Sequence, residues 1–191
     1  IVISDYGKGF ITPALIRDVT AWAQARGIFV AVDPKSRDFS IYRGASVLTP
    51  NRKELETAWG KPLRSLEDVG RAAQALSISA GIPQMLVTLG AQGMLYTAQG
   101  ESHHIPGLAK EVYDVAGAGD TVIATLAVCV AAGASTLTAA MIANAAASLV
   151  VANVREPASL YELLLAHDAE AIEAMTHAAG VHSLEAAAAL C

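Results

Sequence analysis

Short apolar runs alternate with amphipathic stretches along the first half of this chain, and this alternation is typical of strands and helices in turn. The strand-like runs are residues 1–3, 28–32, 47–49 and 84–88, followed by a further pair at 94–97 and 103–105. Helix signals mark residues 12–26, 51–58 and 66–80. Strands that alternate with helices indicate βα units, so we expect an α/β fold, doubly wound around a mostly parallel sheet flanked by helices.

The second half of the chain carries no charged residue from Thr121 to Val154, which invites a membrane interpretation. Residues 131–136, Ala-Ala-Gly-Ala-Ser-Thr, divide this run into two helix-length segments. Each segment is shorter than the roughly 20 residues that span a bilayer, and the polar Asn144 and Ser148 interrupt it further. We therefore expect two helices buried inside a soluble α/β domain and no membrane partner.

The composition fits one globular domain with a sizeable core, because 53% of the 191 residues are hydrophobic. The formal net charge is -5 and the basic residues form no stripe, so nucleic acid is not an expected partner. Cys129 and Cys191 are far apart and do not make a disulfide framework, which favours a reducing, cytoplasmic compartment. The chain opens inside a strand-like run without a methionine, so we expect further residues upstream.

Polar segments follow the predicted strands or stand where a loop turns into a helix. They are residues 5–8, 33–35, 51–54, 88–93 and 114–120. In parallel α/β sheets, ligands bind beyond the carboxyl ends of the strands. We therefore expect these segments to share one rim and to form a ligand site there.

Residues 114–120, Asp-Val-Ala-Gly-Ala-Gly-Asp, stand directly before the uncharged helices. Backbone N–H groups at such a junction can hold an anion, and the helix dipole adds to the attraction. Gly117 and Gly119 permit backbone geometry that a side chain would obstruct, although glycines also serve in tight turns. Asp120 could be a helix-terminal residue stabilised by the dipole, or a base that receives a proton from an attacking hydroxyl. With the glycines beside it we favour the base, which suits phosphoryl transfer.

The same seven residues resemble the C-terminal signature D-T-x-G-A-G-D of the ribokinase-like (PfkB) sugar kinases and match it except at the second and third positions, Val115 and Ala116. The resemblance implies that Asp120 activates the sugar hydroxyl. It assigns the anion hole for the transferring phosphoryl group to Gly117, Ala118 and Gly119. It also implies ATP and Mg²⁺ as cofactors, with K⁺ as a further candidate that Asp114 could contact.

Five further segments resemble the heptose 7-phosphate kinase domain, the kinase half of bifunctional heptose kinase/adenylyltransferases. They are residues 4–9 (SDYGKG), 33–35 (DPK), 42–45 (YRGA), 48–51 (LTPN) and 111–115 (EVYDV). The resemblance implies ATP-dependent phosphorylation of the anomeric hydroxyl of D-glycero-β-D-manno-heptose 7-phosphate to the 1,7-bisphosphate, in lipopolysaccharide core synthesis. The partners it implies are ATP, a small sugar phosphate and, for the full-length protein, a second copy in a homodimer.

The segment Asn51-Arg52-Lys53-Glu54 matches the N-x-x-E element of that family, which lies at the nucleotide phosphates and their Mg²⁺. Glu54 could hold hydrated Mg²⁺ through a water. The structural alternative is an N-cap asparagine followed by a glutamate three residues later, a capping arrangement that is compatible with binding.

Other polar residues are weaker candidates for the nucleotide site. Thr88, Gly90 and Gly93 resemble a T-x-G-x-x-G nucleotide segment, and Asn144 resembles an adenine-side residue or is a buried, hydrogen-bonded asparagine. Lys8 and Lys35 each follow a strand and could donate to phosphate oxygens or remain solvated. Asp5 and Asp33 could help to position Mg²⁺ or could terminate strands.

The resemblance covers roughly residues 1–165, the C-terminal, nucleotide-binding and catalytic part of a PfkB-type kinase domain. Residues 166–191 are expected to form a helical tail or linker that could lead to a second domain. Family members usually continue into a Gly- and Thr/Ser-rich loop that helps to bind a monovalent cation, whereas residues 152–159 read Ala-Asn-Val-Arg-Glu-Pro-Ala-Ser. Arg155 could replace the charge of that cation, or the loop could still supply backbone carbonyls.

Two alternatives stay open at this point: another PfkB sugar or nucleoside kinase, and a non-catalytic nucleotide-binding fragment. The isolated 191 residues are expected to show little kinase activity because the family's N-terminal half supplies most sugar-binding residues. His103-His104 has no further ligand at metal spacing, so zinc is not expected. Trp22 and Trp59 are expected to anchor helices in the core, and Cys129 to be buried.

Overall fold

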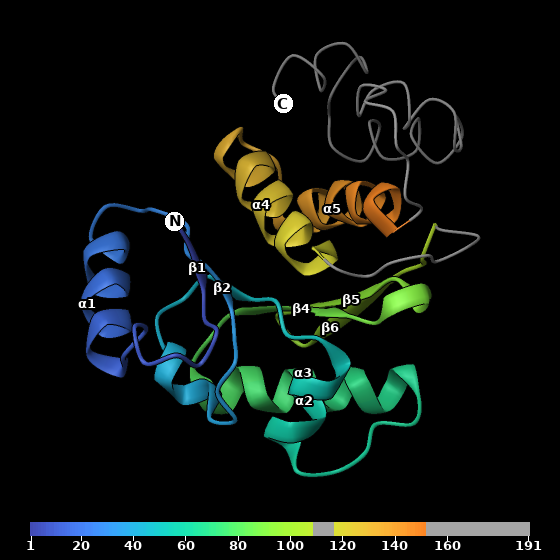
Figure 1. Cartoon of the computed structure of the whole chain (residues 1–191), viewed down its shortest axis with the longest axis horizontal. Helices are drawn as coiled ribbons and strands as arrows, with labels where there is room; N and C mark the ends of the chain where they lie inside the picture. The colour runs from blue at the N-terminus through green and yellow to red at the C-terminus, as the bar shows by residue number, and fades with distance from the viewer. Residues whose placement is uncertain (109–116, 152–191) are drawn as a thin grey trace. The chain divides into compact units, whose positions relative to one another are not determined.

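The computed structural model describes residues 1–108 and 117–151, which fall into two compact units (Figure 1). The first, here called the sheet unit, is Ile1–Pro106, and the second begins at Gly107. The described helices of the second unit are here called the helical unit.

The sheet unit is built on six strands in sequential order. They are β1 Val2–Ser4, β2 Ala31–Asp33, β3 Val47–Leu48, β4 Gln84–Thr88, β5 Met94–Ala98 and β6 Glu101–Ile105. The first four strands are parallel, and β4, β5 and β6 pair antiparallel. The predicted α/β class with a mostly parallel sheet is therefore confirmed, and so is the predicted β excursion after residue 93.

Helices connect the parallel strands of the sheet unit. They are α1 Pro13–Gln24, the 3-10 turn η1 Phe39–Tyr42, α2 Arg52–Trp59 and α3 Leu66–Ala80, and a second 3-10 turn, η2 Gly90–Gln92, follows β4. Right-handed crossovers between strands in sequential order bring the connecting helices to the same face of a sheet. Figure 1 shows α2 and α3 together on one face.

Local sequence determines where these helices begin and end. The Thr12 side chain accepts a hydrogen bond from the Leu15 N–H and Pro13 opens α1, while Ser65 forms a capping box at the start of α3. Helices α2 and α3 end at Gly60 and Gly81, whose φ angles of 77° and 68° are left-handed. A glycine adopts this conformation without the steric cost of a Cβ.

The apolar face of these helices packs on the sheet to form the core. Its fully buried members come from every layer of the unit and include Ile16 of α1, Val32 of β2, Tyr42 of η1, Leu48 of β3, Leu55 of α2, Val69 of α3 and Met85 of β4. Removing this apolar surface from water is the main stabilising contribution to the unit. The same packing holds the carboxyl ends of the strands in place.

The helical unit consists of α4, Ala118–Ala131, and α5, Thr136–Val151, which pack against each other. The predicted pair of apolar helices is thus confirmed, and Ser135 starts the second by accepting a hydrogen bond from the Thr138 N–H at 3.1 Å. Cys129 is buried, as expected. Within residues 1–108 and 117–151, no helix combines the length and hydrophobicity needed to cross a bilayer.

Three sequence expectations are wrong in detail. Strand β2 begins at Ala31 rather than at residue 28; the Val30 N–H donates to the Ser46 hydroxyl, whereas the Val30 carbonyl accepts from the Val47 N–H of β3. Helix α1 ends at Gln24, before the expected Arg26, in a turn closed by Gly27. Trp22 is half exposed beneath the Arg26 guanidinium, 4.3 Å from its ring, and Trp59 is also exposed, so neither is a core anchor.

Candidate active site

The parallel strands end at one edge of the sheet unit, and hydrogen bonds tie the loops there to one another. The Asp5 N–H donates to the Asp33 carbonyl at 3.0 Å, and the Thr49 N–H donates to the Val32 carbonyl at 2.9 Å. Asn51 and Thr88 form a parallel bridge, which joins the loops after β3 and β4. The segments that the sequence placed on a common rim after β1, β2, β3 and β4 therefore do lie along this edge.

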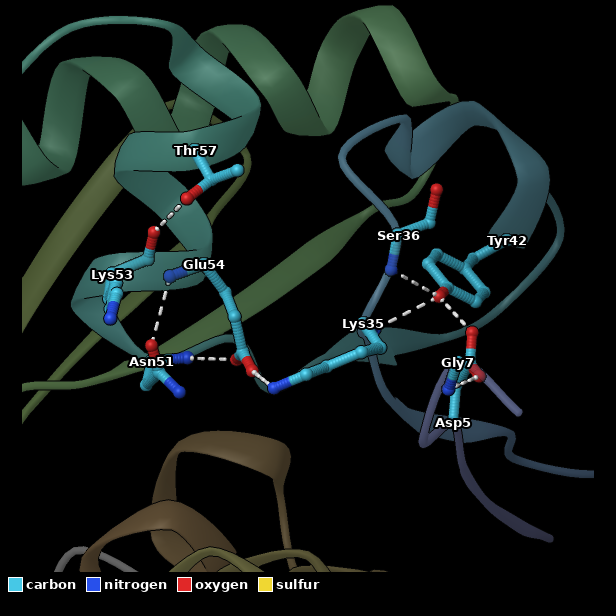
Figure 2. A network of polar contacts seen from close by, with 9 residues as sticks. All are labelled: Asp5, Gly7, Lys35, Ser36, Tyr42, Asn51, Lys53, Glu54 and Thr57. Carbon is cyan, nitrogen blue, oxygen red and sulfur yellow. Dashed lines mark hydrogen bonds and ion pairs between the residues drawn. The ribbon is translucent and has the colours of Figure 1, made fainter.

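The N-terminus of α2 carries the segment expected at the nucleotide phosphates. Asn51 Oδ1 accepts from the Glu54 N–H and Glu54 Oε2 accepts from the Asn51 N–H, both at 2.9 Å. The capping box is therefore present. The other carboxylate oxygen, Glu54 Oε1, lies 3.1 Å from Lys35 Nζ, so two predicted site residues from neighbouring loops form an ion pair (Figure 2).

Arg52 and Lys53, the other charged residues of segment 51–54, have different surroundings. Arg52 donates to the Gln92 side-chain oxygen at 2.6 Å, and its Nε is buried with no hydrogen-bond partner in the part of the chain that the structure describes. The Lys53 side chain is exposed. Arg52 thus links the start of α2 to the turn after β4.

That turn is the second predicted nucleotide segment, and it lies against the first. The Thr88 N–H donates to the Pro50 carbonyl at 3.0 Å, and the Leu89 N–H donates to the Gly93 carbonyl at 2.8 Å. Gly90 and Gly93 have φ angles of 61° and 86°, the left-handed region that favours glycine. The structure therefore brings residues 51–54 and 88–93 together. Because Gly90 and Gly93 have no side chain, a bound ligand can come close to the backbone there.

The first two strand-end loops are joined by a buried network that the sequence did not reveal (Figure 2). The Tyr42 hydroxyl donates to Asp5 Oδ2 at 2.6 Å and accepts from the N–H groups of Lys35 and Ser36, both at 3.0 Å. The second Asp5 oxygen accepts from the Gly7 N–H at 2.8 Å. Both Asp5 oxygens are engaged by the protein, so Asp5 terminates its strand and organises the loop.

Burial and the neighbouring Asp5 carboxylate raise the pKa of Tyr42 to about 12. We predict that the free energy of unfolding falls as the pH rises from about 10 to about 12, because the unfolded tyrosine loses its proton near 10 while the folded one keeps it. The loss should amount to about 2–3 kcal/mol. Denaturant unfolding across this range measures it, with Tyr42→Phe as the comparison. Equal pH slopes for the two proteins would contradict the prediction.

Two further candidates of the sheet unit, Lys8 and Asp33, lie at the ends of β1 and β2. Lys8 is exposed in the loop after β1, between Gly7 and Gly9, whose φ angles are 63° and 86°. Asp33 is half-buried at the end of β2, where its carbonyl accepts from the Asp5 N–H. Lys8 keeps its predicted place on a strand-end loop, and nothing described fixes its amine.

The start of α4 has the geometry expected of an anion-binding helix N-terminus. Gly117, with φ 78°, is the N-cap, and its carbonyl accepts the first helical bond from the Thr121 N–H at 2.9 Å. The amides of Ala118, Gly119 and Asp120 precede that bond, and such amides have no partner inside a helix. A Cβ added at either glycine would meet nothing within 4 Å. Backbone N–H groups at a helix N-terminus are the kind of donor that binds phosphate groups.

The other two predicted residues of the second unit, Asp120 and Asn144, lie on α4 and α5. Asp120 is exposed in the first turn of α4. Asn144 on α5 is buried, 4% exposed, and its carbonyl accepts from the Ser148 hydroxyl at 2.8 Å. Asp114, Arg155 and the proposed boundary at residue 165 lie outside the described residues. Within residues 1–108 and 117–151, no three His, Cys, Asp or Glu side chains gather to hold a metal.

The sheet unit has an α/β sheet with polar strand-end loops, and the helical unit begins at a glycine N-cap with Asp120 in its first turn. Residues 11–159 match the pfkB family of carbohydrate kinases. The chain belongs to this family, which confirms the resemblance drawn from the sequence.

Relatives extend this comparison. The chain is 45% identical over 155 residues to the bifunctional protein HldE of Trichlorobacter lovleyi, and 49% identical over 154 residues to that of Paramagnetospirillum magneticum. These matches cover 81% and 80% of this chain, and 32% of each relative. The chain thus spans about a third of the length of these curated relatives.

Solved structures share the fold. Arabidopsis thaliana ribokinase, complexed with ribose and ATP, superposes with a TM-score of 0.68 at 27% identity over 83% of this chain and 50% of that one. Phosphofructokinase-2 from Escherichia coli, in complex with potassium, gives 0.69 at 25% identity over 80% and 50%. The chain therefore has a ribokinase-like fold and corresponds to part of the domain.

Proposed function

We propose that the intact protein is an ATP-dependent sugar kinase that phosphorylates the anomeric hydroxyl of D-glycero-β-D-manno-heptose 7-phosphate to the 1,7-bisphosphate, in lipopolysaccharide core precursor synthesis. Membership of the pfkB family supports the reaction class. Identities of 45–49% to proteins named bifunctional HldE support the heptose substrate. The observation that carries the proposal is the start of α4, where a glycine N-cap leads into a helix whose first turn carries the Asp120 carboxylate.

In this proposal the chemistry belongs to the first turn of α4. The amides of Ala118 and Gly119, led in by Gly117, hold the transferring phosphoryl group and stabilise the charge that develops on it. The Asp120 carboxylate takes the proton from the sugar hydroxyl. The hydroxyl oxygen forms a bond to the terminal phosphorus of ATP, the bond from that phosphorus to the bridging oxygen breaks, and ADP leaves with the electron pair.

The sheet unit supplies the nucleotide side of the proposal. Glu54, through a water, is the candidate for holding Mg²⁺, an ion that keeps several of its waters when it binds together with substrate phosphates. When bound, Mg²⁺ neutralises charge on the phosphates. The other proposed contacts come from the strand-end loops and, for the adenine, from α5: Lys8, Lys35, Asn51, Arg52, Lys53, Thr88, Gly90, Gly93 and Asn144.

The same proposal includes a monovalent cation, a tail after the kinase part and a homodimer. Asp114 would contact a monovalent cation, and the potassium bound to phosphofructokinase-2 of Escherichia coli supports a test of K⁺. Residues 1–165 would form the kinase part and residues 166–191 a tail or linker towards a second domain. The protein would act in the cytoplasm as a homodimer.

A panel of acceptors tests the function. The intact protein, supplied with Mg·ATP, should phosphorylate heptose 7-phosphate with a kcat/KM at least about 100-fold above that for ribose, fructose 1-phosphate or adenosine, because a site built for polar groups rejects analogues that lack them. Product position is read by phosphorus NMR. Preference for another acceptor would replace the heptose assignment. ATP binding in calorimetry without turnover on any acceptor would favour a non-catalytic nucleotide-binding module.

A further inference from the structure

The Tyr42 hydroxyl stands at the centre of a continuous chain of contacts that ends at Glu54 (Figure 2). It starts at the loop after β1, where Asp5 accepts from Gly7, and passes through the Tyr42 hydroxyl to the backbone of Lys35. The Lys35 side chain then continues it to the Glu54 carboxylate.

The hydroxyl is well placed to fix the backbone at Lys35. Tyr42 is 0% exposed, so its ring cannot shift without disturbing the core. Its oxygen accepts from two successive amides, Lys35 and Ser36, and donates to a carboxylate. A buried hydroxyl that makes three hydrogen bonds holds its partners in one geometry, since losing any of them leaves a buried polar group unpaired.

The Lys35 side chain is only partly held in place by its own contacts. The Lys35 side chain is 56% exposed, whereas the Glu54 side chain is 17% exposed and is also fixed by the Asn51 N–H. An exposed ion pair is weak because a long side chain must be ordered to form it. The direction of the Lys35 amine therefore depends on where its backbone is anchored.

We propose that Tyr42 is a positioning residue of the kinase: its hydroxyl anchors the Lys35 backbone, so that the Lys35 amine faces the Glu54 carboxylate where Mg·ATP binds. This inference rests on the proposed function, because it gives Lys35 and Glu54 their ligand. A tyrosine hydroxyl is protonated at neutral pH, so the donor bond from Tyr42 to Asp5 is present there.

The first test needs no ligand and uses the wild-type protein. In hydrogen exchange, the Lys35 and Ser36 amides should be as protected as the amides of β2, because their acceptor is the buried hydroxyl. In competitive acetylation, Lys35 should react about two- to fivefold more slowly than the exposed Lys61, because its amine is paired with a carboxylate for part of the time. Unprotected amides, or equal reactivity of the two lysines, would overturn the proposal even if no variant folds.

The second test compares Tyr42→Phe with Tyr96→Phe, which also removes a tyrosine hydroxyl from the sheet unit, one that donates to Gln84. Tyr42→Phe should abolish the slow labelling of Lys35 and should raise both the KM and the calorimetric Kd for Mg·ATP about tenfold with little change in kcat. Tyr96→Phe should change none of these. A Tyr42→Phe protein that is less stable but binds Mg·ATP normally would show a structural role only and overturn the assignment.

A double-mutant cycle tests whether Tyr42 affects Mg·ATP binding through Lys35. In a Lys35→Met background, Tyr42→Phe should raise the KM for Mg·ATP by less than about twofold, because the side chain that it positions is gone. Additive effects would overturn the assignment of Tyr42 alone. Wild-type protein that neither binds nor consumes Mg·ATP would overturn the proposed function, and this inference with it.

Discussion

Replacing Asp120 with asparagine is expected to lower kcat of the intact protein by about 100- to 10,000-fold while leaving the Kd for Mg·ATP within a few-fold of wild type. Asparagine keeps the size and the exposed position of Asp120 in the first turn of α4, but it cannot take a proton from a sugar hydroxyl. Loss of negative charge at a helix N-terminus costs little stability, about 0.3–1 kcal/mol. The effect should therefore be confined to the chemical step.

Single-turnover kinetics with saturating Mg·ATP and acceptor, combined with calorimetry, separates the two quantities. Asp18→Asn is a matched control, because Asp18 is an exposed aspartate on α1 and its only described ion pair is with the adjacent Arg17. It should leave kcat unchanged. Turnover of Asp120→Asn within about tenfold of wild type would remove Asp120 from the role of base.

Replacing Gly119 with alanine is expected to reduce phosphoryl transfer about 100-fold while leaving stability unchanged or slightly higher. An added Cβ at this position meets nothing within 4 Å in the protein, and alanine is the better helix former by up to about 1 kcal/mol. The methyl group would instead occupy the space that we assign to the phosphoryl group. Stability and activity should therefore move in opposite directions, which a purely structural glycine would not produce.

Two companion variants sharpen this test. Val128→Ala lies on the same helix, at a half-exposed position, and should gain helix propensity without losing activity. Gly117→Ala should lose about 1–2 kcal/mol of stability as well as activity, because residue 117 has a φ of 78°. Denaturant unfolding and kcat/KM are measured for all three. Full activity of Gly119→Ala would show that no ligand approaches the α4 amides closely.

Much of the fold follows from local sequence patterns. Apolar runs predicted the parallel strands, and Asn51 with Glu54 predicted the capping box that the structure contains. The break in the uncharged run predicted two helices instead of one span. These features depend on near neighbours in the chain, so the sequence carries them directly. The bond from the Val30 N–H to the Ser46 hydroxyl, just before β2, joins residues 16 positions apart and could not be predicted from the strand itself.

The sequence predicted individual residues of the site but not the contacts between them. Glu54 and Lys35 were each candidates, but their ion pair joins loops 19 residues apart. The Tyr42 network spans 37 residues to Asp5 and requires the sheet register to be known. A usable sequence signal existed, because a buried tyrosine needs a partner for its hydroxyl. For Trp22 the sequence predicted burial that the structure does not show, because this aromatic residue on an amphipathic helix is half exposed.

The roles given to the first turn of α4 are tested most directly by a crystal structure of the intact protein with Mg²⁺, a non-hydrolysable ATP analogue and the acceptor sugar. We predict that the terminal phosphate accepts hydrogen bonds at about 3 Å from the backbone amides of the turn that leads to Asp120. The Asp120 carboxylate should lie about 2.6–3.2 Å from the anomeric hydroxyl. A terminal phosphate bound away from these amides, or an acceptor hydroxyl beyond the reach of Asp120, would contradict the assignment.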